Sequence, residues 1–363
     1  MLRILHVGLS VNPGGVENFV LNYHRNINTD IIQFDYLDIY GDGIAFSEDI
    51  KSLGGHIYSL PHYKNHPFLA MKAFKNILWE HKFDIMHIHM QSAANLMPVM
   101  IGLKQKDIVI ICHSHSSATP NGLLRKILNQ VNRPIIRKFD ICKWACGNRA
   151  GEWMWGKDFK ENDMIANAIE YDLYQYNETV RKQVRESLSM TDHEKVVGFV
   201  GRFGEEKNIF FLIDVLIELL KISPDYKLLT VGGNDLYDQF RYKIKREKLE
   251  KHYYSAGIQL SAREWYQAMD AFLLPSYFEG FPMVGVEAQA SGLPCFFSDR
   301  ISKEINISGS VKFLPIGKEN AVVWAKAIDK SLTSQERDVS FPDEYIIEFA
   351  AKHIEQKYES LIG

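Results

Sequence analysis

The sequence has few cysteines, no long apolar run and no excess of charge of one sign. Its four cysteines are spread over 363 residues, too few for a disulfide framework, which favours a reducing compartment. No apolar stretch approaches the ~18 to 20 residues that span a bilayer, and the first residues resemble a strand more than a signal peptide. We therefore expect a cytoplasmic protein. The formal net charge of −3 gives no reason to expect a nucleic-acid partner.

Length and pattern predict two α/β domains. At about 150 residues per domain, a chain of this length favours two. Short β-rich runs alternate with helical patterns, which is typical of parallel sheets. The expected strands are 2–9, 31–40, 56–60, 83–89, 107–112, 139–146, 196–201, 226–232, 252–257, 271–276, 293–298 and 311–316. Residues 5–23 and 198–216 form a weak repeat of strand, Val-Gly, loop and amphipathic helix, so two doubly wound sheets in tandem explain the chain better than one.

Two segments bear on the domain boundaries. The stretch from Asn167 to Asn177, which follows a further expected strand at 163–166, is polar and rich in tyrosine, so we expect the chain to pass between domains there. The last amphipathic segment, 344–362, has no strand after it and can pack on either domain. Doubly wound sheets bind ligands at the carboxyl ends of their strands, so the loops at those ends are the candidate sites.

The first candidate loop holds Gly14 and Gly15 between a strand and a helix. Glycines let the backbone approach a ligand closely, and the N–H groups at a helix start favour an anion such as phosphate. A tight turn without a ligand is an equally good explanation. Neither G-x-G-x-x-G nor the P-loop pattern occurs in this loop, which removes the main sequence support for nicotinamide or ATP binding of those kinds.

The equivalent loop of the second half carries two cations, Arg202 and Lys207, around a helix start. Both can converge where the N–H groups of the helix already favour a doubly charged anion. Taken without other motifs, this pair is better explained as ordinary surface charge.

The most specific pattern spans 275–287, where Glu279 and Glu287 flank a Gly-Phe-Pro segment. Pro282 suits the first turn of a helix, and Glu287 then falls between one and two turns in. We expect both carboxylates to face one crevice, where they can accept hydrogen bonds from vicinal hydroxyls of ribose or a hexose.

Two His-x-His pairs, His87/His89 and His113/His115, lie in or beside two other strands. Residues two apart on a strand point to the same side, so four imidazoles can come close enough to bind zinc. No carboxylate or thiolate is clearly positioned to complete such a site, so no metal is expected. A single catalytic or phosphate-contacting histidine is the preferred interpretation, with structural histidines as the alternative for His87 and His89.

Together these motifs resemble the retaining glycosyltransferases of family 4. The resemblance rests on Gly-Gly-x-Glu after the first strand, a histidine at the end of the fifth, Gly-Arg with a lysine five residues beyond the arginine, and Glu279 followed by seven residues and Glu287. It spans nearly the whole chain and implies a GT-B fold, with two Rossmann-like domains facing a central cleft. The implied domains are 1–168, with helix 344–363 packing back on it, and 169–343.

The resemblance also implies an activity and its substrates. The second domain would hold a nucleotide-sugar donor, by family habit a UDP-sugar, and the first a saccharide acceptor, which in this setting is lipid-linked. The subgroup is similar to bacterial enzymes of exopolysaccharide or capsule assembly. The family needs no metal or other cofactor, because cationic side chains take the place of Mg²⁺. Another GT-B activity, such as a sugar-nucleotide epimerase, and a catalytically silent scaffold are the alternatives.

Residue roles follow from the same resemblance. Arg202 and Lys207 would hold the diphosphate, Glu287 the ribose and Glu279 the transferred sugar. The catalytic residues that the resemblance implies are His113, Glu279, Arg202 and Lys207. The other implied donor contacts are the Gly14–Gly15 loop, His113 near the phosphate and sugar, and the backbone N–H groups of Gly280, Phe281 and Met283. Where the family often has Lys-Gly, this chain has Lys207-Asn208, a change expected to be neutral.

A basic amphipathic segment suggests a separate partner. Residues 121–149 hold seven basic residues against one acid, Asp140, with apolar residues at helical spacing. Such a surface can lie on an anionic membrane, where a lipid-linked acceptor would wait. A helix that packs its apolar side on the sheet and leaves a solvated basic edge is the alternative.

Overall fold

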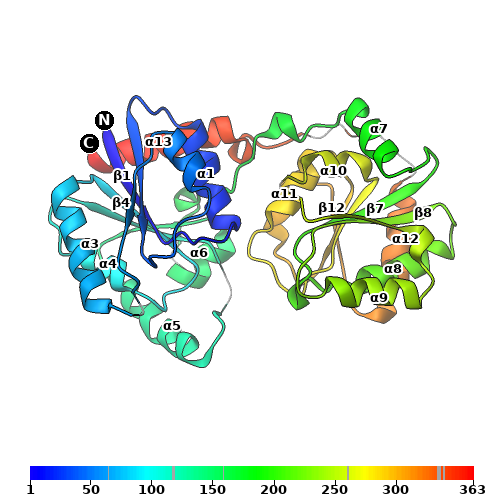
Figure 1. The fold of residues 1–363 in the computed structure, drawn as a ribbon, viewed down its shortest axis with the longest axis horizontal. Coiled ribbons are helices and arrows are strands. Elements are labelled where there is room, and N and C mark those ends of the chain that lie inside the picture. Colours follow the sequence, from blue (N-terminus) through cyan, green and yellow to red (C-terminus); the bar gives the residue numbers. More distant parts are fainter. Residues whose placement is uncertain (64, 117–118, 158, 260, 333–336, 338–339) are drawn as a thin grey trace. The chain divides into compact units, whose positions relative to one another are not determined.

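The computed structural model describes residues 1–363 except 64, 117–118, 158, 260, 333–336 and 338–339. The chain forms two compact units (Figure 1). Unit 1 is Met1–Ile169 with Asp343–Gly363, and unit 2 is Glu170–Pro342. The first change of unit follows Ile169, where the sequence had suggested 168. Among the described residues, none of the helices has both the length and the hydrophobicity needed to cross a bilayer.

Unit 1 is built on a six-stranded parallel sheet with the order β3-β2-β1-β4-β5-β6. Its strands are β1 (Leu2–Val7), β2 (Ile32–Asp38), β3 (Ile57–Ser59), β4 (Ile85–Met90), β5 (Val109–Ser114) and β6 (Cys142–Ala145). Its helices are α1 (Gly15–Asn26), α2 (Ser47–Ser52), α3 (Pro67–His81), α4 (Met97–Gly102), α5 (Leu123–Ile136), α6 (Asn148–Trp155) and α13 (Ile347–Ile362). The strand order reverses between β1 and β4, which is where such a sheet binds ligands.

Alternation along the strands divides the core of unit 1 between the two faces of its sheet. On one face, Ile4 and Ile85 belong to a cluster with side chains of α1 and α13. On the other, Leu5 and Met86 belong to a cluster with side chains of α3, α4 and α6. The carboxyl-terminal helix α13 therefore completes unit 1, as the family resemblance implied.

Unit 2 repeats this topology with the order β12-β11-β10-β7-β8-β9. Its strands are β7 (Lys195–Val200), β8 (Tyr226–Val231), β9 (Tyr253–Gly257), β10 (Ala271–Leu274), β11 (Cys295–Ser298) and β12 (Val311–Leu314). Its helices are α7 (Glu178–Ser187), α8 (Phe210–Leu220), α9 (Tyr237–Arg246), α10 (Arg263–Ala268), α11 (Met283–Ala290) and α12 (Ala321–Ser331). The strand order reverses between β7 and β10, the counterparts of β1 and β4.

Every strand of both sheets overlaps a run expected from the sequence. One further expected strand, at residues 163–166, was wrong, because this segment forms only an isolated bridge between Met164 and Ala145. Close packing at the end of β1 explains the glycine of the first Val-Gly pair. A Cβ on Gly8, which follows β1 with φ +107°, would lie 2.4 Å from the carbonyl oxygen of His89 on β4.

Candidate functional site

The loops that follow β7 and β10 meet at the point of unit 2 where the strand order reverses, since these strands are neighbours. Lys207 ends the short 3-10 turn after β7, and its Nζ donates to Oε1 of Glu279 at 2.7 Å. Beside it, Nδ2 of Asn208 donates to the carbonyl of Pro275 at 3.2 Å. Two motifs far apart in the sequence therefore form one cluster.

The Lys207 and Glu279 side chains are largely shielded from water, with 18% and 11% of their surfaces exposed. Oγ of Ser276 also donates to Oε1 of Glu279, at 2.6 Å, which fixes the carboxylate from a second side. A shielded ion pair is screened less by salt than an exposed one. An anion that approaches Lys207 must therefore compete with Glu279 for the ammonium group.

Arg202 is likewise held by carboxylates. Its guanidinium donates to Oε1 of Glu206 at 2.7 Å and lies 3.6 Å from Oδ2 of Asp235, while its own side chain is 55% exposed. Burial acts to raise the pKa of Glu206, but a backbone hydrogen bond and Arg202 outweigh it, so the pKa is lowered. Glu206 is therefore charged at neutral pH, and both cations of the cluster have acidic partners.

The departure at Asn208 has a structural explanation. Its φ of 52° lies in the left-handed region, where glycine is unstrained and asparagine is among the residues that tolerate it best. Position 208 of this chain therefore has a backbone conformation that suits glycine and that asparagine also tolerates.

Glu287 lies on α11, the helix that begins at Met283 directly after Pro282. Its Oε2 accepts a hydrogen bond from the hydroxyl of Tyr266 at 2.8 Å. Burial raises the pKa of Glu287, and hydrogen bonds from Tyr266 and Tyr174 oppose that effect. The carboxylate thus already binds hydroxyl donors, the same groups that a sugar presents. Of the backbone donors named above, Gly280 and Phe281 precede α11 and Met283 is its first residue.

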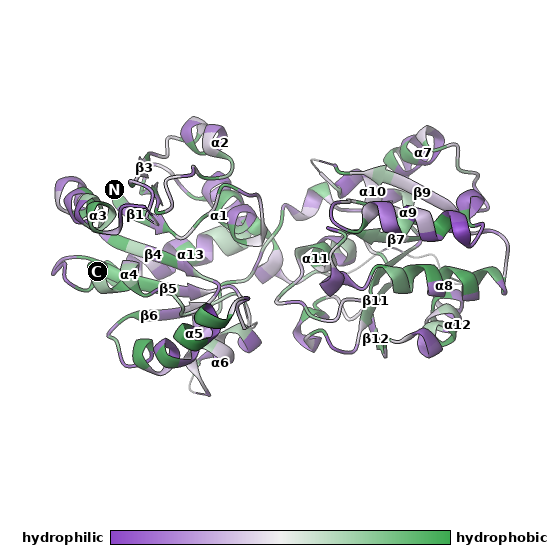
Figure 2. Ribbon diagram, turned by 60° about the horizontal axis from the view of Figure 1, so that its bottom comes forward, coloured by the Kyte–Doolittle hydropathy of each residue, from purple (hydrophilic) through white to green (hydrophobic). Residues whose placement is uncertain are grey.

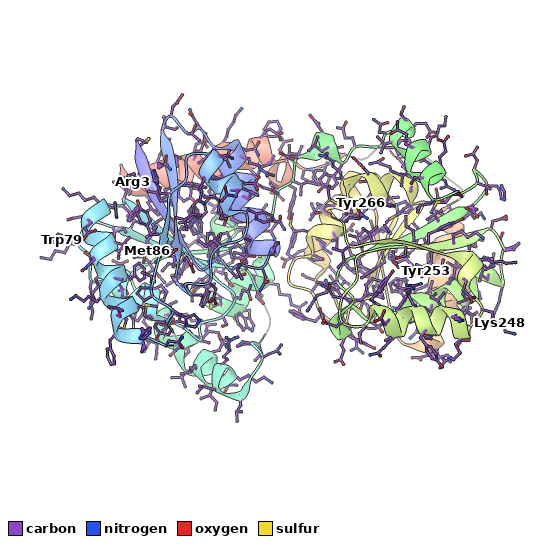
Figure 3. All side chains as sticks on the ribbon, viewed as in Figure 1. Arg3, Trp79, Met86, Lys248, Tyr253 and Tyr266 are labelled. Carbon is purple, nitrogen blue, oxygen red and sulfur yellow. The ribbon has the colours of Figure 1, made fainter. Side chains whose placement is uncertain are left out.

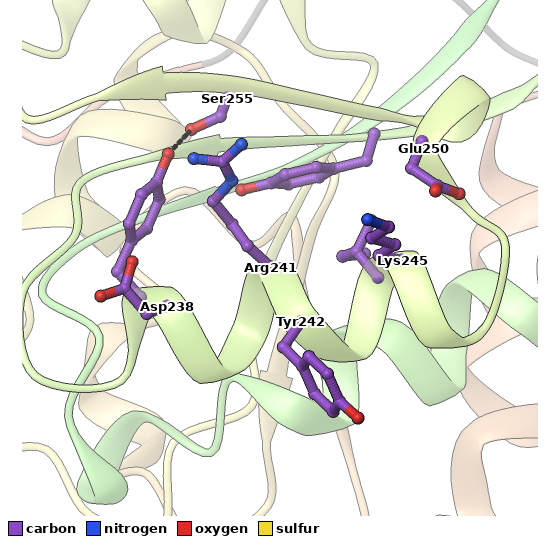
Figure 4. Close-up of a pocket in the computed structure, with 9 residues that line it drawn as sticks. Asp238, Arg241, Tyr242, Lys245, Glu250 and Ser255 are labelled. Carbon is purple, nitrogen blue, oxygen red and sulfur yellow. Dashed lines mark hydrogen bonds between the residues drawn. The ribbon is translucent and has the colours of Figure 1, made fainter.

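A separate pocket of about 620 Å³ lies between α9 and β9 (Figure 4). The hydroxyl of Tyr237 and Oγ of Ser255, 2.9 Å apart, form a hydrogen bond across it. Its lining includes none of the four charged residues predicted from the sequence. This pocket is therefore separate from the charged loops, and the loops remain the candidate site because they bring the charged groups together.

In unit 1, the glycine loop precedes α1, with Gly14 in an extended conformation at φ −150° and Gly15 as the first helical residue. A Cβ on Gly15 would meet no heavy atom within 4 Å. Packing within this loop therefore does not require glycine at position 15. Glu17 accepts hydrogen bonds from the backbone N–H and the hydroxyl of Ser10, at 2.8 and 2.9 Å, so it stabilises its own loop.

Five histidines lie together on or just after β1, β4 and β5. They are His6, His87, His89, His113 and His115. One hydrogen-bonded series runs from Nδ1 of His6 to Nε2 of His89 and from Nδ1 of His89 to Nε2 of His115, both steps at 2.9 Å. The other runs from the hydroxyl of Tyr358 on α13 to Nδ1 of His87, at 2.7 Å, and from Nε2 of His87 to Nδ1 of His113, at 3.1 Å. Burial is the main cause that lowers the pKa of all five, to about 3 for His115.

His113 is enclosed in this cluster and not at the surface. Its ring is 0% exposed, stacks on His115 at 4.1 Å and meets the ring of Phe19 edge-on at 5.1 Å. Its Nε2 has no hydrogen-bond partner among the described residues. His115, in contrast, remains partly exposed. A direct contact of His113 with a donor stays a prediction.

Two trios of these rings have the spacing of metal ligands. The trios are His6/His87/His89 and His89/His113/His115, each with nitrogen atoms within 4.8 Å of one another. Neither contains a carboxylate or thiolate to balance a buried divalent charge, and most of the nitrogens are already bonded to one another. The arrangement is better explained as a hydrogen-bonded network.

Several site residues were missed by sequence reasoning. Glu206 stands next to Lys207 in the sequence and was visible as a possible partner. The roles of Tyr266, Tyr174 and Asp235 carry no signal, because they come from other elements that only folding brings to the site.

Comparison with known proteins finds glycosyltransferases that are similar to this chain in sequence and in fold. The family described as "Glycosyl transferases group 1" matches residues 180–345. The chain is 29% identical over 337 residues to EpsF of Bacillus subtilis (strain 168), assigned as a glycosyltransferase, with 91% of this chain and 87% of EpsF covered. It is 23% identical to the capsular polysaccharide biosynthesis glycosyltransferase CapH of Staphylococcus aureus, covering 96% of this chain and 95% of CapH.

Among solved structures, Anabaena HepE in complex with UDP and glucose superposes with a TM-score of 0.74 at 17% identity, covering 99% of both chains. The lipopolysaccharide outer core galactosyltransferase WaaB superposes with a TM-score of 0.69 at 16% identity, over 99% of this chain and 100% of WaaB. The two parallel sheets and these neighbours confirm the GT-B fold. Residues 180–345 thus match the group 1 glycosyltransferases, and the relatives that align with most of the chain include bacterial polysaccharide glycosyltransferases.

Proposed function

We propose that the chain is a retaining, family 4 hexosyltransferase that moves a sugar from a UDP-sugar to a lipid-linked saccharide during assembly of a bacterial exopolysaccharide or capsule. The ion pair between Lys207 and Glu279 carries this proposal, because it joins a phosphate-binding motif to a sugar-binding motif. The complexes of HepE with UDP support a uridine nucleotide, and the name of CapH supports a role in capsule assembly.

The proposed chemistry depends on charge at the leaving group. As the bond between the anomeric carbon and the diphosphate breaks, negative charge grows on the departing phosphate. Arg202 and Lys207, together with the helix start beside them, stabilise this charge more in the transition state than in the ground state. The acceptor hydroxyl attacks from the same face, its oxygen forms the new glycosidic bond, and its proton passes to the departing phosphate.

The remaining residues bind the donor. Glu287 accepts hydrogen bonds from the ribose hydroxyls in place of those from the tyrosines, and Glu279 with the N–H groups around Gly280 binds the transferred sugar. No metal ion takes part in this scheme. By the family resemblance, the Gly14–Gly15 loop and His113 of unit 1 would also contact the donor, and for His113 this requires the ring, which is fully buried here, to become accessible.

Turnover of two variants tests the mechanism. Arg202→Ala and Lys207→Ala should each lower kcat by on the order of 10² or more, because each removes positive charge from the leaving group. Lys243→Ala is the matched control, since Lys243 also belongs to unit 2 and pairs with Asp214 at 3.1 Å but lies on α9. Equal rates for all three variants and the wild type would remove the mechanism.

The configuration of the product tests the stereochemistry and separates the alternatives. NMR of the product formed from an α-linked UDP-hexose should show a new α-linkage, with or without a chelator of divalent metals. A β-linked product would contradict retention, and loss of activity with the chelator would contradict metal independence. An epimerised sugar nucleotide with no transfer would instead identify an epimerase.

A further inference from the structure

Helix α5 presents an apolar stripe to solvent. Six of its large apolar side chains are exposed, from 38% for Leu128 to 76% for Leu123. They are Leu123, Leu124, Ile127, Leu128, Val131 and Ile135. At about 100° per residue they fall within an arc of roughly 140°, so they form one continuous face. Much of the ribbon of α5 has the green colour of hydrophobic residues in Figure 2.

The side of α5 that faces the body of unit 1 is mostly polar, and of its large apolar residues only Ile136, at the end of the helix, is buried in the core. Asn129 is buried, and its Oδ1 accepts a hydrogen bond from the backbone N–H of Ala93 at 2.9 Å. Nδ2 of Asn132 donates to the carbonyl of the same residue, also at 2.9 Å. A surface helix of a globular protein normally buries its apolar stripe. In α5 the orientation is reversed, which contradicts the alternative in which the apolar side packs on the sheet.

Positive charge surrounds this apolar face. Arg125 and Lys126 in α5 and Lys138 just after it are exposed, and α5 contains no acidic residue. Within 121–149 the only acid is Asp140, against seven basic residues. A partner that suits this surface must offer an apolar layer beneath a layer of negative charge.

We propose that α5 docks unit 1 on an anionic lipid bilayer, with its apolar face among the acyl chains and its cations among the headgroups. Its 14 residues span about 21 Å, less than the ~30 Å hydrocarbon core, so the helix lies in the interface and does not cross it. This inference goes beyond the proposed transfer reaction and does not depend on it, because Arg202→Ala should bind vesicles as the wild type does.

Vesicle flotation of the full chain tests the proposal. The protein should float at low salt with vesicles that contain about one third phosphatidylglycerol, and much less with pure phosphatidylcholine or at high salt. The triple variant Leu124→Gln, Ile127→Gln, Val131→Gln should bind anionic vesicles at least ~10-fold more weakly, since it removes the centre of the apolar face. Lys126→Glu should lower binding in a salt-dependent manner.

A matched control uses exposed apolar residues elsewhere on the same unit. Phe68 and Trp79 on α3 are 87% and 78% exposed, and Figure 3 shows Trp79 projecting outward. The double variant Phe68→Gln, Trp79→Gln should float like the wild type. Circular dichroism and the thermal midpoint establish that each variant is folded.

Three outcomes would overturn the proposal. These are no flotation with anionic vesicles at low salt, flotation of the folded triple variant equal to that of the wild type, and a dimer in solution that the triple variant converts to a monomer. The last result would identify a second copy of the chain as the partner of α5.

Discussion

At the residue scale, the candidate site of unit 2 contains cations that are already neutralised by carboxylates. Lys207 pairs with Glu279, and Arg202 pairs with Glu206 and Asp235. The spacing of the motifs predicted that these cations belong to a site but not which carboxylates pair with them. An ion pair depends on the directions of the side chains, and the spacing of residues along the chain does not determine those directions. A diphosphate must therefore replace existing ion pairs and not fill an empty cationic site.

This competition predicts a gain in affinity on removal of one acid. Glu206→Gln should bind UDP about two- to fivefold more tightly than the wild type, the effect expected when an exposed arginine is released from a carboxylate. Isothermal titration calorimetry measures the change. Glu247→Gln is the control, because Glu247 pairs with Arg246 at 2.9 Å on the surface of the same unit. Weaker binding by Glu206→Gln would contradict the competition.

At the element scale, the sequence predicted which segments form strands and helices better than it predicted which way they face. Period-two and helical patterns predicted the strands and helices, because the buried side of each element repeats apolar residues at a regular interval. The reversed orientation of α5 could not be predicted in this way. Periodicity shows that its apolar residues share one face, but it does not show whether that face points to the core or to solvent. The burial of His113 was also missed, because Phe19 from α1 and His115 beyond the end of β5 cover its ring.

The buried histidines of β1, β4 and β5 predict a loss of stability in mild acid. Burial lowers the pKa of each histidine in the folded state, whereas an unfolded histidine has a pKa near 6.5. Below that pH the unfolded chain binds protons that the folded chain does not. As the pH is lowered below about 6.5, the free energy of unfolding should therefore fall by up to about 1.4 kcal/mol per pH unit for each histidine. Above pH ~7 the free energy of unfolding should no longer depend on these histidines.

Urea denaturation of the full chain measures the slope of the free energy of unfolding against pH. The range from pH ~5.5 to ~7.5 lies above that in which most carboxylates titrate. His89→Gln should reduce the slope by the contribution of one proton, whereas His66→Gln, at an exposed position, should leave the slope unchanged. A stability that is flat across this range would contradict neutral buried rings.

At the scale of the whole molecule, the weak repeat in the sequence corresponds to two sheets with the same strand order. In each, the first strand lies beside the fourth, and the loop after the first strand carries a candidate motif. The chain ends in unit 1, where α13 completes the core and Tyr358 contacts His87. The amphipathic pattern of this helix fits either core, so only the family resemblance assigned it to the first domain.

We propose above all that the loops after β7 and β10 bind the diphosphate of a uridine nucleotide. Isothermal titration of the full chain with UDP, GDP and ADP tests this binding most directly. UDP should bind most tightly, Lys207→Ala should weaken that binding at least ~10-fold, and Lys243→Ala should leave it unchanged. No binding of UDP, or equal binding by wild type, Lys207→Ala and Lys243→Ala, would contradict the claim.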